Sequence, residues 1–257
     1  MNWTRNVVIK SKAEIKIMRD AGKINFKALQ AVKEAIRPGI STGELDRIAE
    51  TVIRDHRGKP MFLGYPGPPN PYPATLTVCL NEEMVHGIPG KRILKEGDLV
   101  SVDCGTLYDG FVADSAFSVG VGEVSEEVQQ LLEVTERALE IGISKMVLGN
   151  RIGDVGAAIQ EYVSSFGYFV PQEYTGHGVG RQMHEGPQVP NYGTPGKGIE
   201  LVEGMTIALE PMTLVGTNKT KVLADRWTVV SVDGSLTAHF EHSVAVTNGK
   251  PYVLTTE

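Results

Sequence analysis

Residues 99–117 read LVSVDCGTLYDGFVADSAF, two largely apolar runs joined by Asp109-Gly110. An Asp-Gly pair between such runs is a strong signal for a β-hairpin with a two-residue turn. A turn of that length makes Asp103 and Asp114 diagonal neighbours on one face of the hairpin. Two carboxylates this close repel each other unless they are protonated or share a cation. Because the surrounding residues are too apolar for a solvated surface, the hairpin predicts a metal site.

Three more candidate ligands follow in the second half of the chain. His177 lies between glycines, Glu210 ends an apolar strand just before Pro211, and Glu241 lies in the apolar-rich stretch 237–246, which we expect to form one strand. Four carboxylates and one imidazole form a hard, oxygen-rich ligand set. Such a set suits two adjacent divalent ions better than one structural zinc. If these side chains converge, the protein is a metal-dependent hydrolase.

The chain reads as two similar halves, about residues 11–120 and 121–250. Each half begins with a long amphipathic helix and a shorter one, expected over 15–36 and 42–52 and over 128–141 and 152–166. Each half then has a strand that reads Glu-Gly, an apolar run and an acid.

These two strands are residues 96–103 and 203–210, and the segment 86–89 aligns with 177–180. Agreement of helix order, glycine spacing and acid position makes a chance match improbable. We therefore predict an α+β fold with two pseudo-symmetric halves. Their strands would form one curved antiparallel sheet, with the helices on one face and the site on the other.

The composition is that of an ordinary globular protein, with 257 residues of which 41% are hydrophobic, and a net charge of −6. The chain has no basic block that would indicate nucleic-acid binding, and no run approaches the roughly 20 apolar residues of a membrane span. Residues 1–5 lack the apolar core of a signal peptide, and Cys79 and Cys104 form no CxxC pair. We expect a cytoplasmic protein without nucleic-acid or membrane partners.

Two further histidines are candidates for contact with a substrate. His86 lies in the segment MVHGIP, and His184 follows the histidine ligand candidate by seven residues, in RQMHEGP. Both can hydrogen-bond to a substrate or transfer a proton. His239 and His242 flank Glu241, and we interpret them as packing or supporting residues.

Together these motifs resemble the type I methionine aminopeptidases of bacteria. The matching stretches are MRDAG (18–22), NEEMVHGIP (81–89), DCG (103–105), GFVAD (110–114), GHGVG (176–180), HEGP (184–187), EP (210–211) and FEH (240–242). The resemblance extends from about Ser11 to Leu254. It implies the pita-bread fold as one catalytic domain over residues 1–257, with residues 1–10 as a short N-terminal segment. It also implies removal of the initiator methionine, with a preference for a small second residue.

The resemblance implies a role for each candidate ligand. Asp103 corresponds to the bidentate ligand of one metal ion. His177 and Glu210 correspond to ligands of the other ion, and Glu210 also to a catalytic group that transfers protons. Asp114 and Glu241 correspond to bridging ligands.

The resemblance also implies substrate contacts. His86 and His184 correspond to histidines near the scissile peptide, with catalytic roles. An apolar pocket for the methionine side chain would be lined, by position, by Tyr72, Thr77, Met183 and Trp227. The Pro-rich stretch 65–71 at the rim of this pocket is longer than is usual in the family.

The implied cofactors are two divalent ions per chain, and the ligand chemistry is compatible with Co²⁺, Mn²⁺, Fe²⁺ or Zn²⁺. The family can also carry a monovalent cation near Asn81, Glu83 and Thr237. The implied partners are the N-termini of nascent polypeptides. Contact with the ribosome is compatible with that role, although no basic patch indicates it. We expect a monomer.

Two alternatives stay open. Another pita-bread peptidase, such as a prolidase or an X-Pro aminopeptidase, would carry a substantial domain before the catalytic one, whereas 85 residues precede His86 here. A non-catalytic binding protein on the same fold would have lost ligands, whereas all five positions are intact. A type II enzyme would carry an insertion between His184 and Glu210, which are only 26 residues apart.

Overall fold

A computed structural model describes residues 7–67 and 69–257, so residues 1–5, which were read above for a signal peptide, and Pro68 of the Pro-rich stretch lie outside the described residues. The helices are α1 (Lys12–Ala35), α2 (Thr42–Asp55), α3 (Glu126–Lys145) and α4 (Ile152–Ser164). The first half contributes the strands β1 (Lys59–Pro60), β2 (Leu76–Leu80), β3 (Glu83–Val85), β4 (Leu99–Tyr108) and β5 (Phe111–Gly120). The second half contributes β6 (Gly176–Gly178), β7 (Glu185–Val189), β8 (Thr206–Leu209), β9 (Met212–Leu214), β10 (Thr220–Val222), β11 (Val229–Ser231), β12 (Thr237–His239), β13 (Glu241–Ala245) and β14 (Tyr252–Val253).

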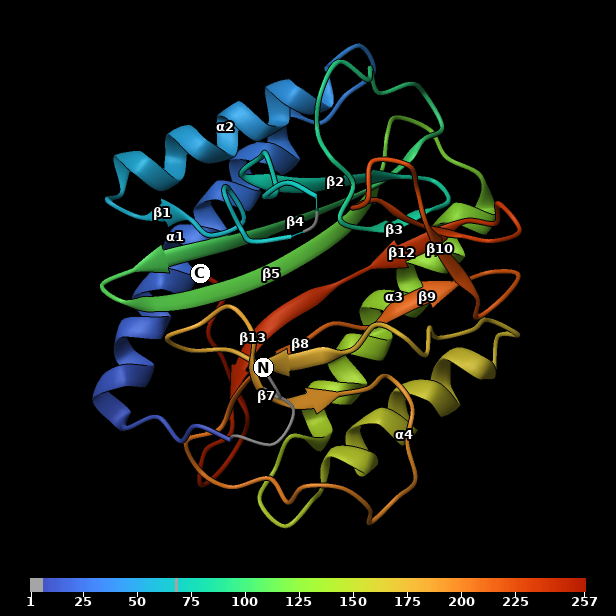
Figure 1. The fold of residues 1–257 in the computed structure, drawn as a ribbon. Helices are drawn as coiled ribbons and strands as arrows, with labels where there is room; N and C mark the ends of the chain where they lie inside the picture. Colours follow the sequence, from blue (N-terminus) through green and yellow to red (C-terminus); the bar gives the residue numbers. More distant parts are fainter. Residues whose placement is uncertain (1–6, 68) are drawn as a thin grey trace.

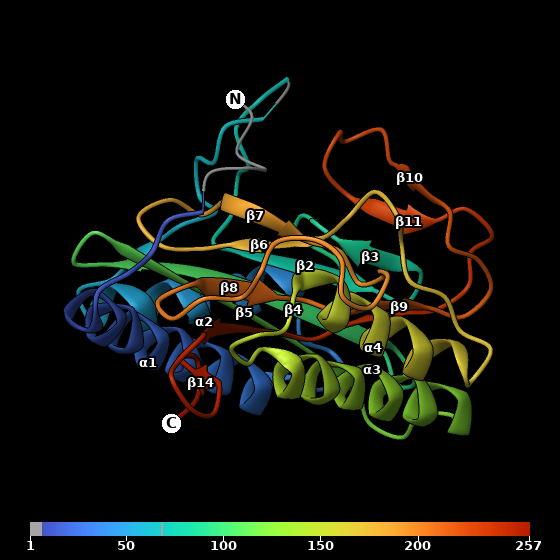
Figure 2. The ribbon, with the colours of Figure 1, turned by 90° about the horizontal axis from the view of Figure 1, so that it is seen from below.

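One nine-stranded sheet runs through both halves in the order β1-β4-β5-β13-β8-β6-β7, with β2 on β4 and β14 on β13. The halves join where β13 pairs with β5, and the strand pairs within this sheet are antiparallel. Figure 1 shows this curved sheet, and Figure 2 shows the helices on one side of it and the β10–β11 hairpin projecting from the other. The predicted α+β pita-bread architecture is therefore confirmed.

The first two helices begin with the same capping device. Ser11 and Ser41 each accept a hydrogen bond from the backbone N–H of a glutamate three residues on, and that carboxylate bonds back to the serine N–H. The start predicted for the second helix is confirmed. In the second half, α4 ends at Ser164, two residues earlier than expected, because the chain turns tightly there and Gly167 has a φ of 78°.

The hairpin predicted around Asp109-Gly110 is present with the expected register. Tyr108 pairs with Phe111, and Asp103 pairs with Ala116. The two turn residues have φ values of 45° and 79°, the left-handed conformation that a two-residue turn of this kind requires. β4 and β5 therefore carry two acids on one face, as diagonal neighbours.

The strand expected over residues 237–246 is broken, which corrects the prediction of one continuous strand. β12 ends at His239 and pairs with β9, whereas β13 begins at Glu241 and pairs with β5 and β8. Between them the N–H of Phe240 donates to the carbonyl of Pro211, 3.3 Å away. The chain changes partner strands there, and this turns Glu241 into the main sheet.

The strand register also corrects one detail of the internal repeat. Cys79 on β2 and His177 on β6 pair with equivalent positions of β4 and β8. His86 and His184 each follow seven residues later. The counterpart of His86 is therefore His184, and the alignment of residues 86–89 with 177–180 was wrong.

The apolar core lies between the sheet and the helices. In the second half Leu131, Ile159 and Ile207 are fully buried in one cluster, and in the first half Leu45 and Val102 belong to another. Complete burial of such side chains contributes roughly 1.5–3 kcal/mol each. Among residues 7–67 and 69–257, no helix combines the length and hydrophobicity needed to cross a bilayer.

Candidate metal centre

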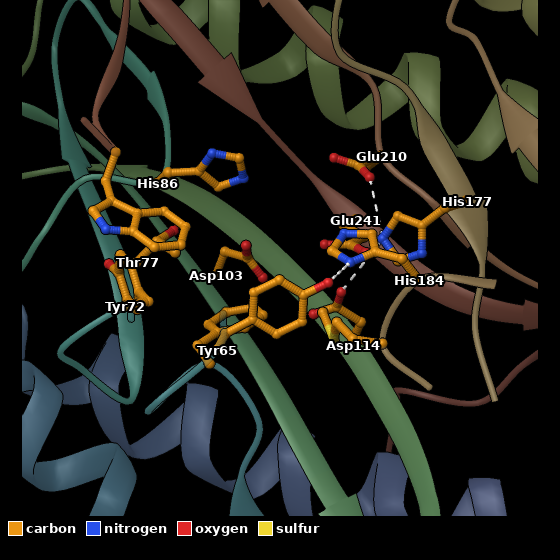
Figure 3. Close-up of a pocket in the computed structure, with 13 residues that line it drawn as sticks. Tyr65, Tyr72, Thr77, His86, Asp103, Asp114, His177, His184, Glu210 and Glu241 are labelled. Atoms are coloured by element: carbon orange, nitrogen blue, oxygen red, sulfur yellow. Dashed lines mark hydrogen bonds and ion pairs between the residues drawn. The ribbon is translucent and has the colours of Figure 1, made fainter. Parts of the chain in front are cut away.

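The five candidate ligands converge in one buried cavity on the face of the sheet opposite the helices (Figure 3). β4 supplies Asp103 and β5 supplies Asp114, while Glu241 begins β13 at the junction of the halves. His177 lies on the short strand β6, and Glu210 follows directly after β8. Five separate strands of the two halves thus bring together the residues that the sequence spreads over more than 130 positions.

The ligand atoms lie close enough to share ions. One ligand atom each from Asp114, His177 and Glu241 lie within 4.8 Å of one another. His177 Nε2 is 3.8 Å from an Asp114 oxygen and 3.6 Å from a Glu210 oxygen. Asp103 joins the group through the facing carboxyl of Asp114.

The cavity strongly disfavours negative charge in the absence of a cation. Burial raises the pKa of Asp103 to about 7. Burial, followed by the neighbouring Glu241 and Asp103 carboxylates, raises the pKa of Asp114 well above its usual value. Glu210 and Glu241 are raised in pKa for the same reasons. Burial lowers the pKa of His177 to about 3, so its imidazole is neutral, the form that binds metal.

Buried polar atoms without hydrogen-bond partners in this cavity fit a cation site. Asp103 Oδ1, Asp114 Oδ1, Glu241 Oε1 and His239 Nε2 are buried and have no hydrogen-bond partner. Buried polar atoms are normally paired, so each such exception needs an explanation. Divalent ions would satisfy the carboxylate oxygens and offset their mutual repulsion. The donor set therefore fits the ions that the family resemblance implies.

His86 and His184 line the same cavity. Burial lowers the pKa of each to about 4, so both rings are neutral. The Nδ1 of His184 lies 2.5 Å from the hydroxyl of Tyr65, and the His184 ring lies 4.3 Å, centroid to centroid, from His177. A tyrosine that donates to Nδ1 leaves the remaining imidazole proton on Nε2.

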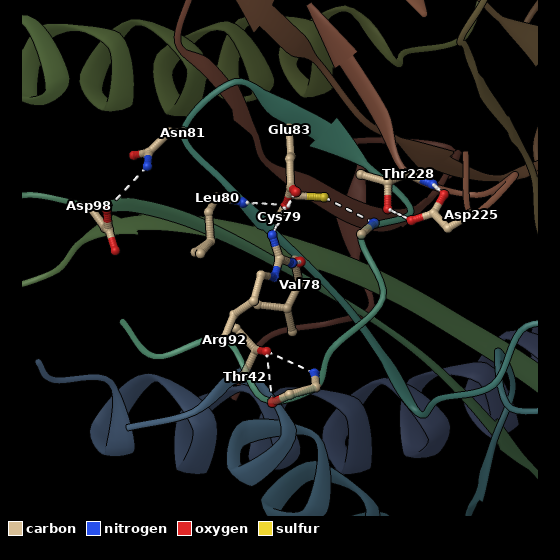
Figure 4. Close-up of polar contacts among 12 residues, drawn as sticks. Thr42, Val78, Cys79, Leu80, Asn81, Glu83, Arg92, Asp98, Asp225 and Thr228 are labelled. Atoms are coloured by element: carbon tan, nitrogen blue, oxygen red, sulfur yellow. Dashed lines mark hydrogen bonds and ion pairs between the residues drawn. The ribbon is translucent and has the colours of Figure 1, made fainter. Parts of the chain in front are cut away.

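Polar contacts involve residues on both sides of His86, and Figure 4 shows those of Cys79, Glu83 and Arg92. His86 itself has a φ of 62°, which is uncommon outside glycine. Directly after it, the Gly87 N–H donates to Cys79 Sγ at 3.2 Å. One nitrogen of Arg92 donates to both oxygens of Glu83 at 2.6 Å. These contacts hold both sides of His86 and so maintain its unfavourable backbone conformation.

The four side chains predicted for an apolar pocket do line this cavity, together with two that the sequence did not single out. The predicted residues are Tyr72, Thr77, Met183 and Trp227, and the additional ones are Phe62 and Tyr65. Tyr72 packs edge-on against Trp227, with ring centroids 5.1 Å apart. Tyr65 opens the Pro-rich stretch 65–71 and Phe62 lies three residues before it, and no periodic pattern in the sequence marks either residue as part of the cavity.

The two histidines beside Glu241 differ in environment. His239 faces the site, with Nε2 at 3.6 Å from Glu210 Oε2 and 3.9 Å from Glu241 Oε2. His242 is instead bonded through Nδ1 to the Thr255 hydroxyl at 2.8 Å. His239 is thus a supporting residue of the acidic cluster, and His242 is a packing residue.

The residues expected near a monovalent cation also lie together. The hydroxyl of Thr237 donates to the carbonyl of Glu83 at 2.9 Å and lies 3.3 Å from the carbonyl oxygen of Asn81, which accepts from the Thr237 N–H at 2.9 Å. Both carbonyls therefore accept a hydrogen bond from Thr237.

The fold and the cavity define a class of protein: a pita-bread metallopeptidase, in which a curved sheet collects buried acids for divalent ions. The sequence profile of metallopeptidase family M24 matches residues 16–248. The chain therefore belongs to this family.

The relatives are consistent with that membership. The chain is 48% identical over 250 residues to a methionine aminopeptidase of Clostridium acetobutylicum, which covers 97% of this chain and 98% of that protein. It is 46% identical to methionine aminopeptidase 1 of Bacillus subtilis, over 94% of this chain and 96% of that protein. The structure of the methionine aminopeptidase of Thermotoga maritima superposes with a TM-score of 0.95 at 44% identity, over 98% of this chain and 100% of that one.

Proposed function

We propose that this protein removes the N-terminal methionine from polypeptides by metal-assisted hydrolysis of the first peptide bond. The observation that carries the proposal is the single cavity in which a metal-type acidic cluster, two neutral histidines and an apolar pocket meet. Sequence identity of 46–48% to methionine aminopeptidases, over nearly the whole chain, supports the same activity.

We assign the ions to Asp103, Asp114, His177, Glu210 and Glu241. The unpaired carboxylate oxygens and the neutral His177 support a site for two divalent ions. Bound there, the ions would act as Lewis acids that activate a water molecule and polarise the peptide carbonyl. Co²⁺, Mn²⁺, Fe²⁺ and Zn²⁺ all suit these ligands.

The protein's own residues would then move protons and orient the substrate. Glu210 would accept the proton of the attacking water and pass it to the leaving amine. If the Tyr65 hydroxyl donates to Nδ1 of His184, the ring proton is on Nε2. His184 would then donate to the oxygen of the scissile carbonyl and stabilise the charge that develops there. His86, which directly follows β3, would contact the scissile nitrogen.

The apolar end of the cavity would hold the methionine side chain. Its walls include Phe62, Tyr72, Met183 and Trp227. A flexible, polarisable thioether packs well against aromatic rings and against another methionine. A small second residue would be preferred because a bulky one would meet the rim of the cavity formed by the loop that carries Tyr65.

Proteins with the same fold but other substrates make the alternative concrete. The prolidase of Pyrococcus furiosus has a TM-score of 0.76 at 23% identity, over 97% of this chain and 66% of that one. That likeness concerns the fold alone.

The proposal is tested by peptide turnover after treatment with a chelator and reloading with each of the four metals. Free methionine should be released from Met-Ala-Ser, and not from its N-acetylated form, because an aminopeptidase needs a free α-amine. Efficient cleavage of an X-Pro peptide beside intact Met-Ala-Ser would contradict the proposal. Action on nascent chains, contact with the ribosome, a cytoplasmic location and a monomeric state stay predictions.

A further inference from the structure

The loop between β6 and β7 carries two residues of the cavity, Met183 and His184. The two ends of this loop are close together because Gly178 pairs with Glu185. The Glu185 carboxylate oxygen Oε1 accepts hydrogen bonds from the backbone N–H groups of Arg181 and Gln182, at 2.7 and 3.1 Å. One side chain therefore closes the turn that presents the histidine.

Glu185 is in turn paired with a residue from the other end of the chain. The ammonium of Lys10 donates to Glu185 Oε2, and the two side chains are only 2% and 6% exposed. Lys10 also donates to the Val8 carbonyl at 3.0 Å. A charged pair that is almost fully desolvated depends strongly on its partner, because removal of one member leaves an uncompensated buried charge.

Two glycines, Gly180 and Gly204, leave room for Lys10. A Cβ at Gly180 would lie 2.3 Å from Lys10 Cε, and a Cβ at Gly204 would lie 2.6 Å from the Lys10 carbonyl oxygen. The Lys10 N–H donates to the Gly204 carbonyl at 2.8 Å, and Val7 forms a parallel bridge with Gly186. The segment before α1 is thus seated against both ends of the β6–β7 turn.

A second, more exposed contact joins the same two parts of the chain. Arg181 Nη2 lies 3.0 Å from Glu14 Oε1 in the first turn of α1, and the Arg181 guanidinium lies 4.4 Å from the centre of the Phe111 ring. The 181–185 turn is therefore held from α1 and from the β4–β5 hairpin as well as by Lys10.

We propose that Lys10 is a positioning residue for His184, acting through Glu185 and the turn that it closes. The proposal rests on the proposed function, because it assigns the N-terminal segment to the same catalytic histidine. Small displacements of a catalytic group lower turnover steeply, by up to about 100-fold per ångström. Lys10 touches neither the substrate cavity nor the assigned metal ligands.

The test substitutes Lys10→Met, which keeps the aliphatic stem and removes the charge, in the wild-type and His184→Ala backgrounds. Metal-loaded Lys10→Met should lose about tenfold in kcat with KM within about twofold and unchanged metal content. In the His184→Ala background the same substitution should cost nothing further. The matched control is Arg137→Met, which breaks an ion pair whose side chains are 60% and 58% exposed, and it should leave kcat unchanged.

Two results would overturn the proposal. One is an equal loss of kcat from Lys10→Met in both backgrounds, which would indicate a general structural effect. The other is a kcat equal to that of Arg137→Met. If Lys10→Met does not fold, Glu185→Gln weakens the same contact from the other side and is judged by the same comparison.

A separate readout covers failure of the proposed function, which would be evident if the wild-type protein released no methionine. In that case amide hydrogen exchange of Arg181 and Gln182 tests whether Lys10 holds the turn, because both N–H groups donate to Glu185. Faster exchange in Lys10→Met than in Arg137→Met supports the positioning role, and equal exchange contradicts it.

Discussion

Single residues carry the chemistry proposed for the cavity, and a substitution of Asp114 tests that chemistry most directly. It faces Asp103, His177 and Glu241, so it contacts acids from both halves as well as the imidazole ligand. We expect Asp114→Ala to lose bound metal and turnover together. A metal ion contributes several kcal/mol to such a reaction, and this corresponds to a loss on the order of a thousandfold.

The control for this substitution is Asp55→Ala, which removes an exposed carboxylate at the end of α2. Metal content is measured by elemental analysis and turnover with Met-Ala-Ser. Metal-free Asp114→Ala should melt no lower than metal-free wild type, because one buried, repelled acid is gone. Near-normal turnover of the metal-loaded variant would show that Asp114 does not bridge.

His239 is the residue whose place was least evident from the sequence. Its buried Nε2 has no hydrogen-bond partner and faces Glu210 and Glu241. Groups that orient metal ligands typically contribute 10–100-fold to metal affinity. We expect His239→Ala to weaken metal binding by about tenfold or more in a calorimetric titration, whereas His56→Ala, on the surface, should not. Equal affinities would mean that His239 only fills space.

The sequence could predict the candidate metal ligands because each lies in a short motif beside a turn, a glycine or a strand end. It could not predict Phe62 and Tyr65, whose contribution depends on the path of an irregular loop rather than on periodicity. Likewise, because the strand is broken at Phe240, strand alternation alone does not determine whether His239 or His242 faces the acids. In a continuous strand the two side chains would lie on opposite faces.

Among the elements, the Pro-rich loop and the β10–β11 hairpin meet over the cavity. A Cβ at Gly67 would lie 2.3 Å from two atoms of the Trp227 indole. We expect Gly67→Ala to displace that ring and raise KM for Met-Ala-Ser by about three- to tenfold, a loss of roughly 1 kcal/mol of substrate binding. The matched control is Gly90→Ala, since nothing lies within 4 Å of a Cβ there. An unchanged KM would place the methionine pocket elsewhere.

Element boundaries followed from local chemistry where that chemistry is strong. The Ser41 cap and the Asp-Gly turn have side chains or φ requirements that few other structures satisfy. The alignment of His86 with His177 failed because short Gly-flanked histidine segments look alike in sequence. Only the pairing of β2 with β4 and of β6 with β8 shows which positions are equivalent.

At the scale of the whole molecule, the acidic cluster ties the two halves together. Glu241 lies where β13 crosses to β5, so ligands from both halves surround the same cavity. We propose on this basis that the chain works as one catalytic domain. Its pseudo-symmetry was visible in the sequence, whereas the order of the strands was not, because pairing between distant strands leaves no local signal.

Metal should therefore stabilise the entire fold. The carboxyl groups are raised in pKa by burial and mutual repulsion, so ionised carboxylates are costly without a cation. Ions at about 100 times their dissociation constant stabilise a folded protein by about 2.7 kcal/mol per site. Two such sites contribute about 5.4 kcal/mol. For a chain of this size we therefore expect chelation to lower Tm by roughly 10–20 °C in calorimetry, and Mn²⁺ to restore it. A Tm insensitive to both would contradict this coupling.

Anomalous diffraction from a crystal soaked in Mn²⁺ tests most directly whether the two halves build one dinuclear site. Two adjacent anomalous peaks are expected in the cavity, within coordination distance of Asp103, Asp114, His177, Glu210 and Glu241. A cavity without peaks, with these carboxylates hydrogen-bonded to one another and protonated, would contradict the metallopeptidase site proposed here.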